Sequence, residues 1–509
     1  MAPKEILWQI SEIKSALKDQ IINIGKVDIE INQVVIDSRA KTNNGLFVAF
    51  KGENNDGHNF LKQAFENGCV LAIVDKVLEE FINDDRLILV KNSLLALEKL
   101  AIFSRTRSKA KIIAVTGSVG KTSVKEMLKT VFETQGKTFA TSGNLNNNFG
   151  LPLSLANMKS DTEFGIFEMG MNHLGEIEVL SQIAQPHIAI ITTVAAAHIG
   201  NFQNEEEIAT KEIFSGAIFS GAIFSGAIVP RAIALEKIAL ERIALAKSEI
   251  FSGLVEGGFA LINADNQHFE FIKNQVITKK IPINNIISFG SKEVSDIRLL
   301  TVEKAEDFHS QVTVFSSKSK QQISYLINTI NQATIFNSLI VVACLQMIGK
   351  DFDAGFKSFK NLETPKGRGN LIKVEKSGIK FTIIDDSYNA NAASMQAGLK
   401  FLVDLKNYQS PSRAIAFIGD MLELGEFSER EHKAIANYIS AYNIDQVLLV
   451  GEAMHGLIAE IKPEKLIGHF QNSSLAAEKL NFQPQNGDII FVKGSRTIRM
   501  EKIIEKLLS

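Results

Sequence analysis

The feature that most constrains this chain is a glycine-rich turn set between an apolar run and a helical pattern. The apolar run covers residues 111–115, which is typical of a buried strand, and the helical pattern extends from about Lys121 to Gln135. The glycines allow a tight turn whose backbone N–H groups face a phosphate, and the start of the helix adds partial positive charge. Lys121 can then reach the β- and γ-phosphates, and the hydroxyl of Thr122 can ligate Mg²⁺. The sequence therefore predicts an ATP-binding loop formed by Thr116, Gly117, Ser118, Val119, Gly120, Lys121, Thr122 and Ser123.

This loop is a shortened form of the common phosphate-binding pattern, which has a glycine at the position of Val115. A strand-to-helix turn that binds no ligand is the structural alternative. That alternative leaves the Gly-Lys-Thr sequence at 120–122 without a purpose. We therefore expect the nucleotide site at this turn.

Short β-branched runs alternate with helical patterns along most of the chain, which favours an α/β fold with largely parallel sheets. A chain of 509 residues is too long for one ordinary core, and its length suggests three domains. Further strands are predicted at 164–168, 188–193, 259–263, 381–385, 414–418, 446–450 and 488–492. The predicted domains are a small mixed α/β domain at 1–106, a central P-loop ATPase-like parallel-sheet domain at 107–366 and a C-terminal Rossmann-like α/β domain at 367–509.

The charge balance argues against one class of partner. Lysine and arginine number 55 against 57 acidic residues, whereas a nucleic-acid binder usually has a basic excess. The first residues lack the pattern of a secretion signal, and no apolar run approaches the roughly 20 residues of a membrane span. Cys69 and Cys344 lack metal-site spacing and are expected to be buried thiols in a reducing compartment. We expect a cytoplasmic monomer with no direct membrane insertion.

One segment is repetitive. Residues 213–228 repeat Ile-Phe-Ser-Gly-Ala, and residues 233–247 run through three similar units of five that begin Ile-Ala-Leu. A period of five matches neither the helical period of 3.6 nor the strand period of two, so no single apolar stripe is expected. The peptide Glu-Ile-Phe-Ser-Gly occurs at 212–216 and again at 249–253. We interpret 209–243 as a duplicated insertion looped out on the surface, with a functional interaction element as the alternative.

The shortened loop resembles that of the Mur ligase and folylpolyglutamate synthetase superfamily. Glu168, at the end of a predicted strand, matches the magnesium-binding glutamate of that superfamily, and His198 matches its second metal-binding position. A carboxylate suits Mg²⁺ well, and imidazole suits it less. A surface ion-pair partner and an ordinary loop histidine are the structural alternatives for these two residues.

Other stretches resemble the Mur ligases more narrowly and cover nearly the whole chain. Residues 37–39, 45–53 and 56–60 are similar to the uridine-nucleotide domain of the family, and 144–152 to the loop that meets the uridine-linked substrate and ATP. Residues 385–391, 419–425 and 492–496 resemble the C-terminal domain of the member that adds D-alanyl-D-alanine. The substrate-binding residues implied are Ser38, Arg39, Lys51, Asp56, His58, Asn146, Asn147, Asp386, Tyr388, Asn389 and Asn391. Several of the last four could instead be turn residues, because Asn-Ala-Asn suits a left-handed turn.

The family also carries a lysine that CO₂ converts to a carbamate and that then ligates Mg²⁺. Lys247 has the matching neighbours, Ala246, Ser248 and Glu249, whereas Lys211 lies closer to His198 but lacks the intervening residue before its glutamate. We expect Lys247, with Lys211 as the alternative. The resemblance thus implies metal ligands at Thr122, Glu168, His198 and Lys247, of which the last three and Lys121 are the catalytic residues. It further implies ATP contacts from Asn331, Asn337 and Arg368.

The resemblance implies ATP and two Mg²⁺ ions as cofactors, and UDP-MurNAc-tripeptide and D-alanyl-D-alanine as substrates. ATP would phosphorylate the tripeptide carboxylate, and the dipeptide amine would displace phosphate from the acyl phosphate. Another ligase of the superfamily, which adds diaminopimelate, lysine or glutamate, is the alternative within the class. A nucleotide-dependent switch and an inactive protein damaged by the insertion are alternatives of other classes.

Overall fold

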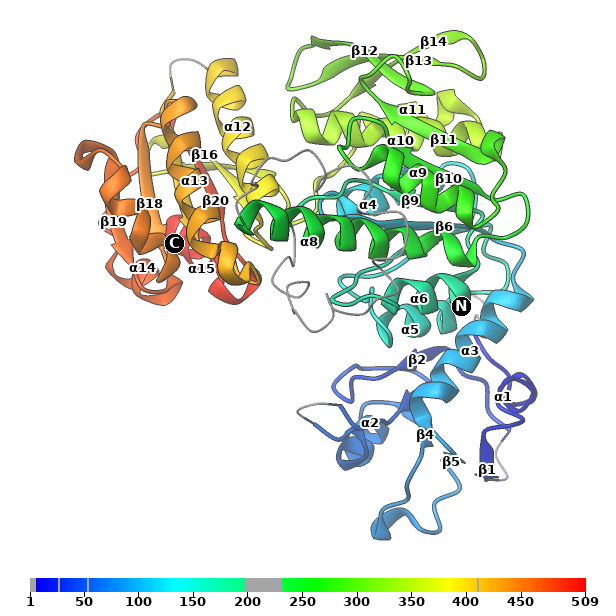
Figure 1. Cartoon of the computed structure of the whole chain (residues 1–509). Coiled ribbons are helices and arrows are strands. Elements are labelled where there is room, and N and C mark those ends of the chain that lie inside the picture. Colours follow the sequence, from blue (N-terminus) through cyan, green and yellow to red (C-terminus); the bar gives the residue numbers. More distant parts are fainter. Residues whose placement is uncertain (1–5, 26–27, 53–54, 197–230, 410–411) are drawn as a thin grey trace.

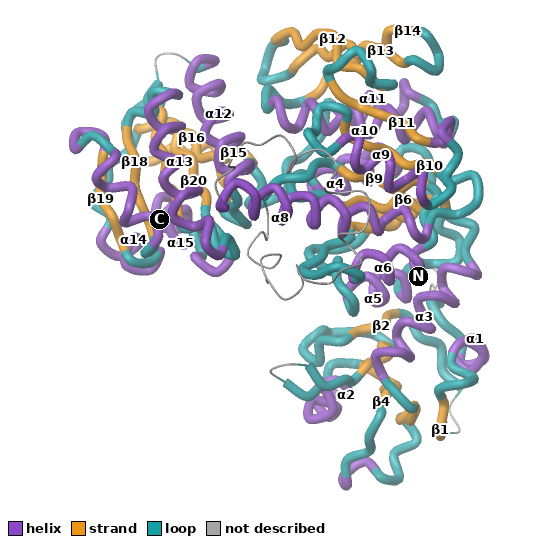
Figure 2. The backbone as a smooth tube through the Cα atoms, viewed as in Figure 1, coloured by secondary structure: helices purple, strands orange, loops and turns teal. Residues whose placement is uncertain are grey.

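The computed structural model describes residues 6–25, 28–52, 55–196, 231–409 and 412–509. Three sheets follow one another along the chain, and each is flanked by helices (Figures 1 and 2). The predicted α/β fold with three domains is confirmed. Among the described helices, none has the length and apolarity needed to cross a membrane.

The first sheet has five strands in the order β1-β5-β4-β3-β2, all parallel except for the edge strand β1. Its strands are β1 Ile21–Ile24, β2 Gln33–Val35, β3 Gly45–Val48, β4 Cys69–Val74 and β5 Leu87–Val90. Its helices are α1 Ile10–Ala16, α2 Leu61–Glu66 and α3 Ser93–Arg107. Helix α3 leads into the next sheet and crosses the predicted domain bound at residue 106, so that bound stays a proposal.

The central sheet has nine strands in the order β14-β13-β12-β11-β10-β9-β6-β8-β7. Its strands are β6 Lys111–Thr116, β7 Thr138–Ala140, β8 Phe164–Glu168, β9 Ile188–Ile191, β10 Phe259–Asn263, β11 Ile286–Gly290, β12 Ile297–Lys304, β13 Ser310–Ser316 and β14 Gln321–Ile327. Strands β7 to β12 are parallel, and β13 and β14 extend the sheet as antiparallel hairpins. The strand that leads into the phosphate loop, β6, is therefore central and has a neighbour on each side.

Helices cover both faces of this central sheet. They are α4 Lys121–Phe132, α5 Gly150–Ala156, α6 Glu176–Ala184, α8 Arg231–Ser248, α9 Phe269–Thr278, α10 Gln332–Ile348 and α11 Phe352–Phe359. Helices α4, α10 and α11 pack in one apolar cluster, whereas α5, α6, α8 and α9 belong to another. A buried sheet with two covered faces explains why its strands read as continuous apolar runs.

The third sheet has six strands in the order β15-β16-β20-β17-β18-β19, parallel except for the edge strand β15. Its strands are β15 Asn370–Lys376, β16 Ile379–Asp386, β17 Ala414–Gly419, β18 Gln446–Val450, β19 Leu466–Phe470 and β20 Ile489–Lys493. Its helices are α12 Ala392–Tyr408, α13 Ser428–Ala441, α14 Ser473–Lys479 and α15 Glu501–Leu508. The predicted strands of this block and of the central block are confirmed to within a few residues.

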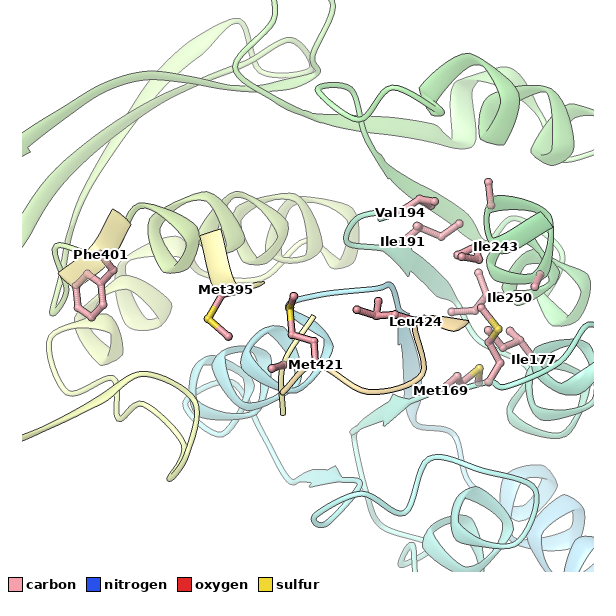
Figure 3. Packing of buried hydrophobic residues seen from close by; sticks show 14 of the residues in the cluster. Met169, Ile177, Ile191, Val194, Ile243, Ile250, Met395, Phe401, Met421 and Leu424 are labelled. Carbon is pink, nitrogen blue, oxygen red and sulfur yellow. The ribbon is translucent and has the colours of Figure 1, made fainter. Parts of the chain in front are cut away.

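The expectation that residues 209–243 loop out is wrong for their last part, because residues 231–248 form helix α8. Ala239, Ile243, Ala246 and Ile250 are buried at helical spacing, and Ile243 and Ile250 pack near Ile177 (Figure 3). The stripe combines alanines and isoleucines from different units, and alanine, leucine, glutamate, lysine and arginine are strong helix formers. Residues 209–230 lie outside the described part of the chain.

Candidate active site

The phosphate loop follows β6 and ends where Gly120 caps helix α4. Gly117 has φ 151°, and a Cβ there would lie 1.9 Å from Oγ1 of Thr192. Gly120 has φ 89°, a left-handed conformation that favours glycine. The ammonium of Lys121 donates to the carbonyl of Gly117 at 2.6 Å and so folds back over the loop. The predicted turn between a strand and a helix is therefore present, and phosphate binding there stays a prediction.

The loop is held by the segment that follows β9. The amide of Ser118 donates to the carbonyl of Thr193 at 2.8 Å, and its hydroxyl donates to the carbonyl of Ala195 at 2.8 Å. Thr192 donates to the carbonyl of Val119 at 2.6 Å, and buried Thr116 donates to that of Met169 at 2.8 Å. The side chains of Ser118 and Thr116 therefore hold the loop in shape.

A buried carboxylate stands beside the loop. Glu168, at the end of β8, accepts from Thr122 Oγ1 at 2.8 Å and from Asn146 Nδ2 at 2.8 Å, and only 3% of the residue is exposed. Both donors come from stretches that the sequence singled out. The structure thus brings together Thr122, Glu168 and Asn146, which supply the oxygen ligands that Mg²⁺ prefers. No group of three or more His, Cys, Asp or Glu side chains suited to a metal occurs among the described residues.

Lys247 on helix α8 faces the same cavity and is 3% exposed. Burial lowers the pKa of Lys247 well below the ordinary lysine value, and the charge of Lys121 lowers it further. Burial also lowers the pKa of Lys121, an effect that Glu168 opposes and Arg368 reinforces. A desolvated amine of lowered pKa is neutral more readily, which is the form that reacts with CO₂. His198 and the alternative Lys211 lie outside the described residues.

The other predicted nucleotide contacts lie around the loop. Asn331 caps helix α10 by accepting from the amides of Ala333 and Thr334, and Asn337 lies against Gly120. The guanidinium of Arg368 lies 4.1 Å from the ring centroid of Tyr388, a cation–π arrangement. A helix cap and a cation–π contact therefore orient Asn331 and Arg368 at the edge of the loop.

The carboxyl ends of the third sheet complete the site. Asp386 ends β16, and Asn391 caps helix α12 with φ −144°, accepting from the amide of Ser394 at 2.9 Å. The alternative that Asn391 occupies a left-handed turn is therefore wrong, because a capping residue is extended. The side-chain oxygen of Asn389 accepts from the amide of Ala390 at 2.9 Å.

These side chains line one cavity of about 400 Å³ between the central and third sheets. The predicted residues that line it are Ser118, Val119, Gly120, Lys121, Thr122, Ser123, Asn146, Asn147, Glu168, Lys247, Asn331, Asn337, Arg368, Asp386, Tyr388, Asn389 and Asn391. Phe401, which was not singled out from the sequence, also lines the cavity, as does Lys493, which belongs to the stretch 492–496 but was given no role. Lys493 stands at the end of a predicted strand, where ligands of α/β sheets bind, and that position was the available signal.

The predicted contacts of the first domain do not line this cavity. His58 is 1% exposed, with Nδ1 2.6 Å from Asp56 and Nε2 3.1 Å from Asp75. Arg39 pairs with Asp37, and Ser38 donates to Gln63 at 2.6 Å. Lys51 is exposed and forms an isolated bridge with Asp56. Their substrate contacts stay predictions, and His58 is buried between Asp56 and Asp75.

Comparison with known families identifies the chain. Residues 115–224 and 238–345 match the Mur ligase middle domain, and residues 367–496 match the Mur ligase glutamate ligase domain. The UDP-N-acetylmuramoyl-tripeptide–D-alanyl-D-alanine ligase of Rickettsia prowazekii is 34% identical over 98% of this chain and 99% of that protein. The chain belongs to the Mur ligase family. The Mur ligase enzyme of the same description from Escherichia coli strain K12 is 30% identical over 94% of each chain.

Solved Mur ligase structures have the same fold. MurF from Acinetobacter baumannii superposes with a TM-score of 0.78 at 27% identity, covering 98% of each chain. MurF from Thermotoga maritima, solved in complex with ADP, gives a TM-score of 0.71 at 26% identity over 93% of this chain and 96% of that chain. The middle-domain match is interrupted between residues 224 and 238, inside the repetitive segment. Residues 225–237 of the repetitive segment are therefore outside the match to the Mur ligase middle domain.

Proposed function

We propose that this Mur ligase joins D-alanyl-D-alanine to UDP-MurNAc-tripeptide, with ATP converted to ADP and phosphate. The observation that carries the proposal is that Lys121, Glu168 and Lys247 of the central domain face Arg368 and Asp386 of the third across one cavity. A cavity shared by two domains suits a reaction in which a nucleotide and an amine meet at one carboxylate. The names of the relatives supply the substrates.

The residues divide the chemistry between them. The loop amides and Lys121 would hold the terminal phosphate of ATP against the tripeptide carboxylate and screen the repulsion between these two anions. The dipeptide amine would then attack the acyl phosphate, and phosphate would leave. Closure of the cavity by the third domain would exclude water from the acyl phosphate.

The residues present fit Mg²⁺. Buried Glu168 and the hydroxyl of Thr122 are oxygen ligands, and Mg²⁺ commonly takes one or two carboxylates together with substrate phosphates. When bound, Mg²⁺ would neutralise charge on the transferring phosphoryl group. A carbamate on Lys247, together with His198, would hold a second ion. We further propose a cytoplasmic monomer whose domains span 1–106, 107–366 and 367–509.

The test is phosphate release from ATP in the presence of UDP-MurNAc-tripeptide, with and without D-alanyl-D-alanine. We expect release to require both substrates and to fall at least about 1,000-fold in Lys121→Ala, because the loop then loses its cation. Lys129→Ala, on the exposed face of the same helix, is the matched control. Release that ignores the dipeptide would support a nucleotide switch, and release with lysine, diaminopimelate or glutamate in its place would support another ligase of the superfamily.

A further inference from the structure

Lys493 is a buried lysine in the shared cavity that none of the roles above uses. Its ammonium is held on two sides, since it donates to Asp386 Oδ2 at 2.7 Å and to the carbonyl of Asn389 at 2.8 Å. Only 2% of Lys493 is exposed. Asp386 and Lys493 are register partners in the parallel strands β16 and β20, at the carboxyl ends of both. Ligands of open α/β sheets bind outside these ends.

The contact leaves one oxygen of Asp386 available. Within the described part of the chain, no group donates a hydrogen bond to Oδ1, and the side chain is 18% exposed towards the cavity. Helix α12 closes over the pair, because a Cβ on Gly398 would lie 2.3 Å from the ring of Phe491 and 3.4 Å from Asp386 Oδ2. The carboxylate is therefore fixed on one side and open on the other.

A buried lysine–aspartate pair is poor evidence of a stabilising role, because desolvation of both charges offsets much of their attraction. Burial raises the pKa of Asp386, and Lys493 is the first group that opposes this rise. Without the ammonium the carboxylate would therefore be protonated more readily and free to rotate. Such a pair suits a site in which the carboxylate must stay ionised and correctly oriented to bind a ligand.

We propose that Lys493 is a positioning residue that orients Asp386 so that Oδ1 accepts a hydrogen bond from an N–H or O–H group of a substrate. The inference rests on the proposed function and names a further residue of that site. All three substrates carry such donors: the ammonium and amide of D-alanyl-D-alanine, the ribose hydroxyls of ATP, and the amide and hydroxyl groups of UDP-MurNAc-tripeptide. Lys493 also holds the backbone of Asn389, so the same contact positions the loop before helix α12.

The experiment is a set of steady-state measurements on Lys493→Met, Lys493→Arg and Asp386→Asn with each of the three substrates varied in turn. We expect Lys493→Met to raise the KM for one substrate at least about tenfold while kcat changes less, since a lost orienting contact weakens binding of that substrate. A rise for one substrate alone shows that the donor to Asp386 belongs to the dipeptide, to ATP or to UDP-MurNAc-tripeptide, respectively. Lys493→Arg, which keeps the charge, should recover part of the loss.

Asp386→Asn keeps Lys493 and should raise the KM for the same substrate. Adding Lys493→Met to Asp386→Asn should then have little further effect, because the two residues act as one unit. Lys406→Met is the matched control, since it removes a 2.7 Å pair with Asp445 in the same domain and away from the cavity, and its KM values should stay within twofold.

Unchanged KM values in Lys493→Met would overturn the proposal, as would KM rises for different substrates in Lys493→Met and Asp386→Asn. If Lys493→Met does not fold, Asp386→Asn and Lys493→Arg are compared with the parent instead. The proposal would be overturned if both variants had the same KM values as the parent. A parent enzyme that shows no dipeptide-dependent phosphate release would contradict the proposed function instead, before any variant is compared.

Discussion

The hydroxyl of Tyr408 accepts a hydrogen bond from the backbone amide of Phe308 at 3.2 Å, and the two rings pack with their centroids 4.7 Å apart. Tyr408 ends helix α12 of the third domain, whereas Phe308 lies in the turn between β12 and β13 of the central domain. The same hydroxyl donates to the carbonyl of Ala305 at 3.4 Å. Phe308 has φ 64°, an unusual conformation for a bulky residue. This clasp therefore joins two domains whose facing ends form the active site.

Replacing Tyr408 with phenylalanine should weaken the clasp. The ring remains, but two hydrogen bonds are lost, each worth about 1 kcal/mol. We expect the unfolding transition of the third domain to begin at lower urea concentration and the radius of gyration in X-ray scattering to increase. Tyr438→Phe is the control, because Tyr438 in helix α13 stacks on Tyr442 just beyond the end of that helix. Identical scattering and unfolding curves for parent and Tyr408→Phe would show that these two hydrogen bonds do not stabilise the contact between the domains.

Replacing Glu168 with glutamine should impair metal binding more than folding. Glutamine can still accept from Thr122 or Asn146, but it lacks the negative charge that Mg²⁺ prefers. We expect the Mg²⁺ concentration for half-maximal ligation to rise and kcat to fall about 100-fold or more. The measurement is a Mg²⁺ titration of phosphate release. An unchanged titration curve would show that Glu168 is not a ligand of Mg²⁺.

Lys247 should make the stability of the protein without CO₂ depend on pH. Because burial lowers the pKa of Lys247, the unfolded chain holds a proton that the folded chain lacks between that lowered pKa and the ordinary value of 10.5. Stability therefore rises with pH across this window. Lys247→Met should unfold at higher urea concentration than the parent near pH 7 and show a shallower pH slope.

The same variant should lose ligation, and the parent should lose activity in CO₂-free buffer and regain it with bicarbonate. Ligation by the parent that ignores bicarbonate, with full activity in Lys247→Met, would exclude the carbamate. Lys237→Met, on an exposed position of the same helix, is the control for both measurements.

Helix α8 should contribute to stability although it carries repeated sequence. Ile243 is fully buried, so Ile243→Ala should lower the free energy of unfolding by about 2–4 kcal/mol. Ile238→Ala, at the matching position of the preceding unit and only half-buried, should cost less. The measurement is urea unfolding followed by circular dichroism. Equal stability of both variants and the parent would mean that this part of the repeats is passenger sequence.

The sequence alone was sufficient for features whose physics is local. The turn from β6 to helix α4 depends on glycines at 117 and 120 and on Lys121, all within a few residues of one another, and it was predicted correctly. The strands were predicted because a sheet covered on both faces requires continuous apolar runs. The family resemblance then supplied Glu168 and Lys247, which spacing within the chain could not have assigned.

Only the tertiary structure decided the contacts between distant segments. Lys493 meets Asp386 because strand β20 inserts between β16 and β17, and strand order is set by packing of whole faces rather than by neighbouring residues. Helix α8 has its buried stripe because α6 and the central sheet offer an apolar surface at the matching spacing, which a five-residue repeat does not reveal. Burial between distant segments depends on how all the helices and sheets pack together. The local sequence pattern of this chain therefore could not determine it.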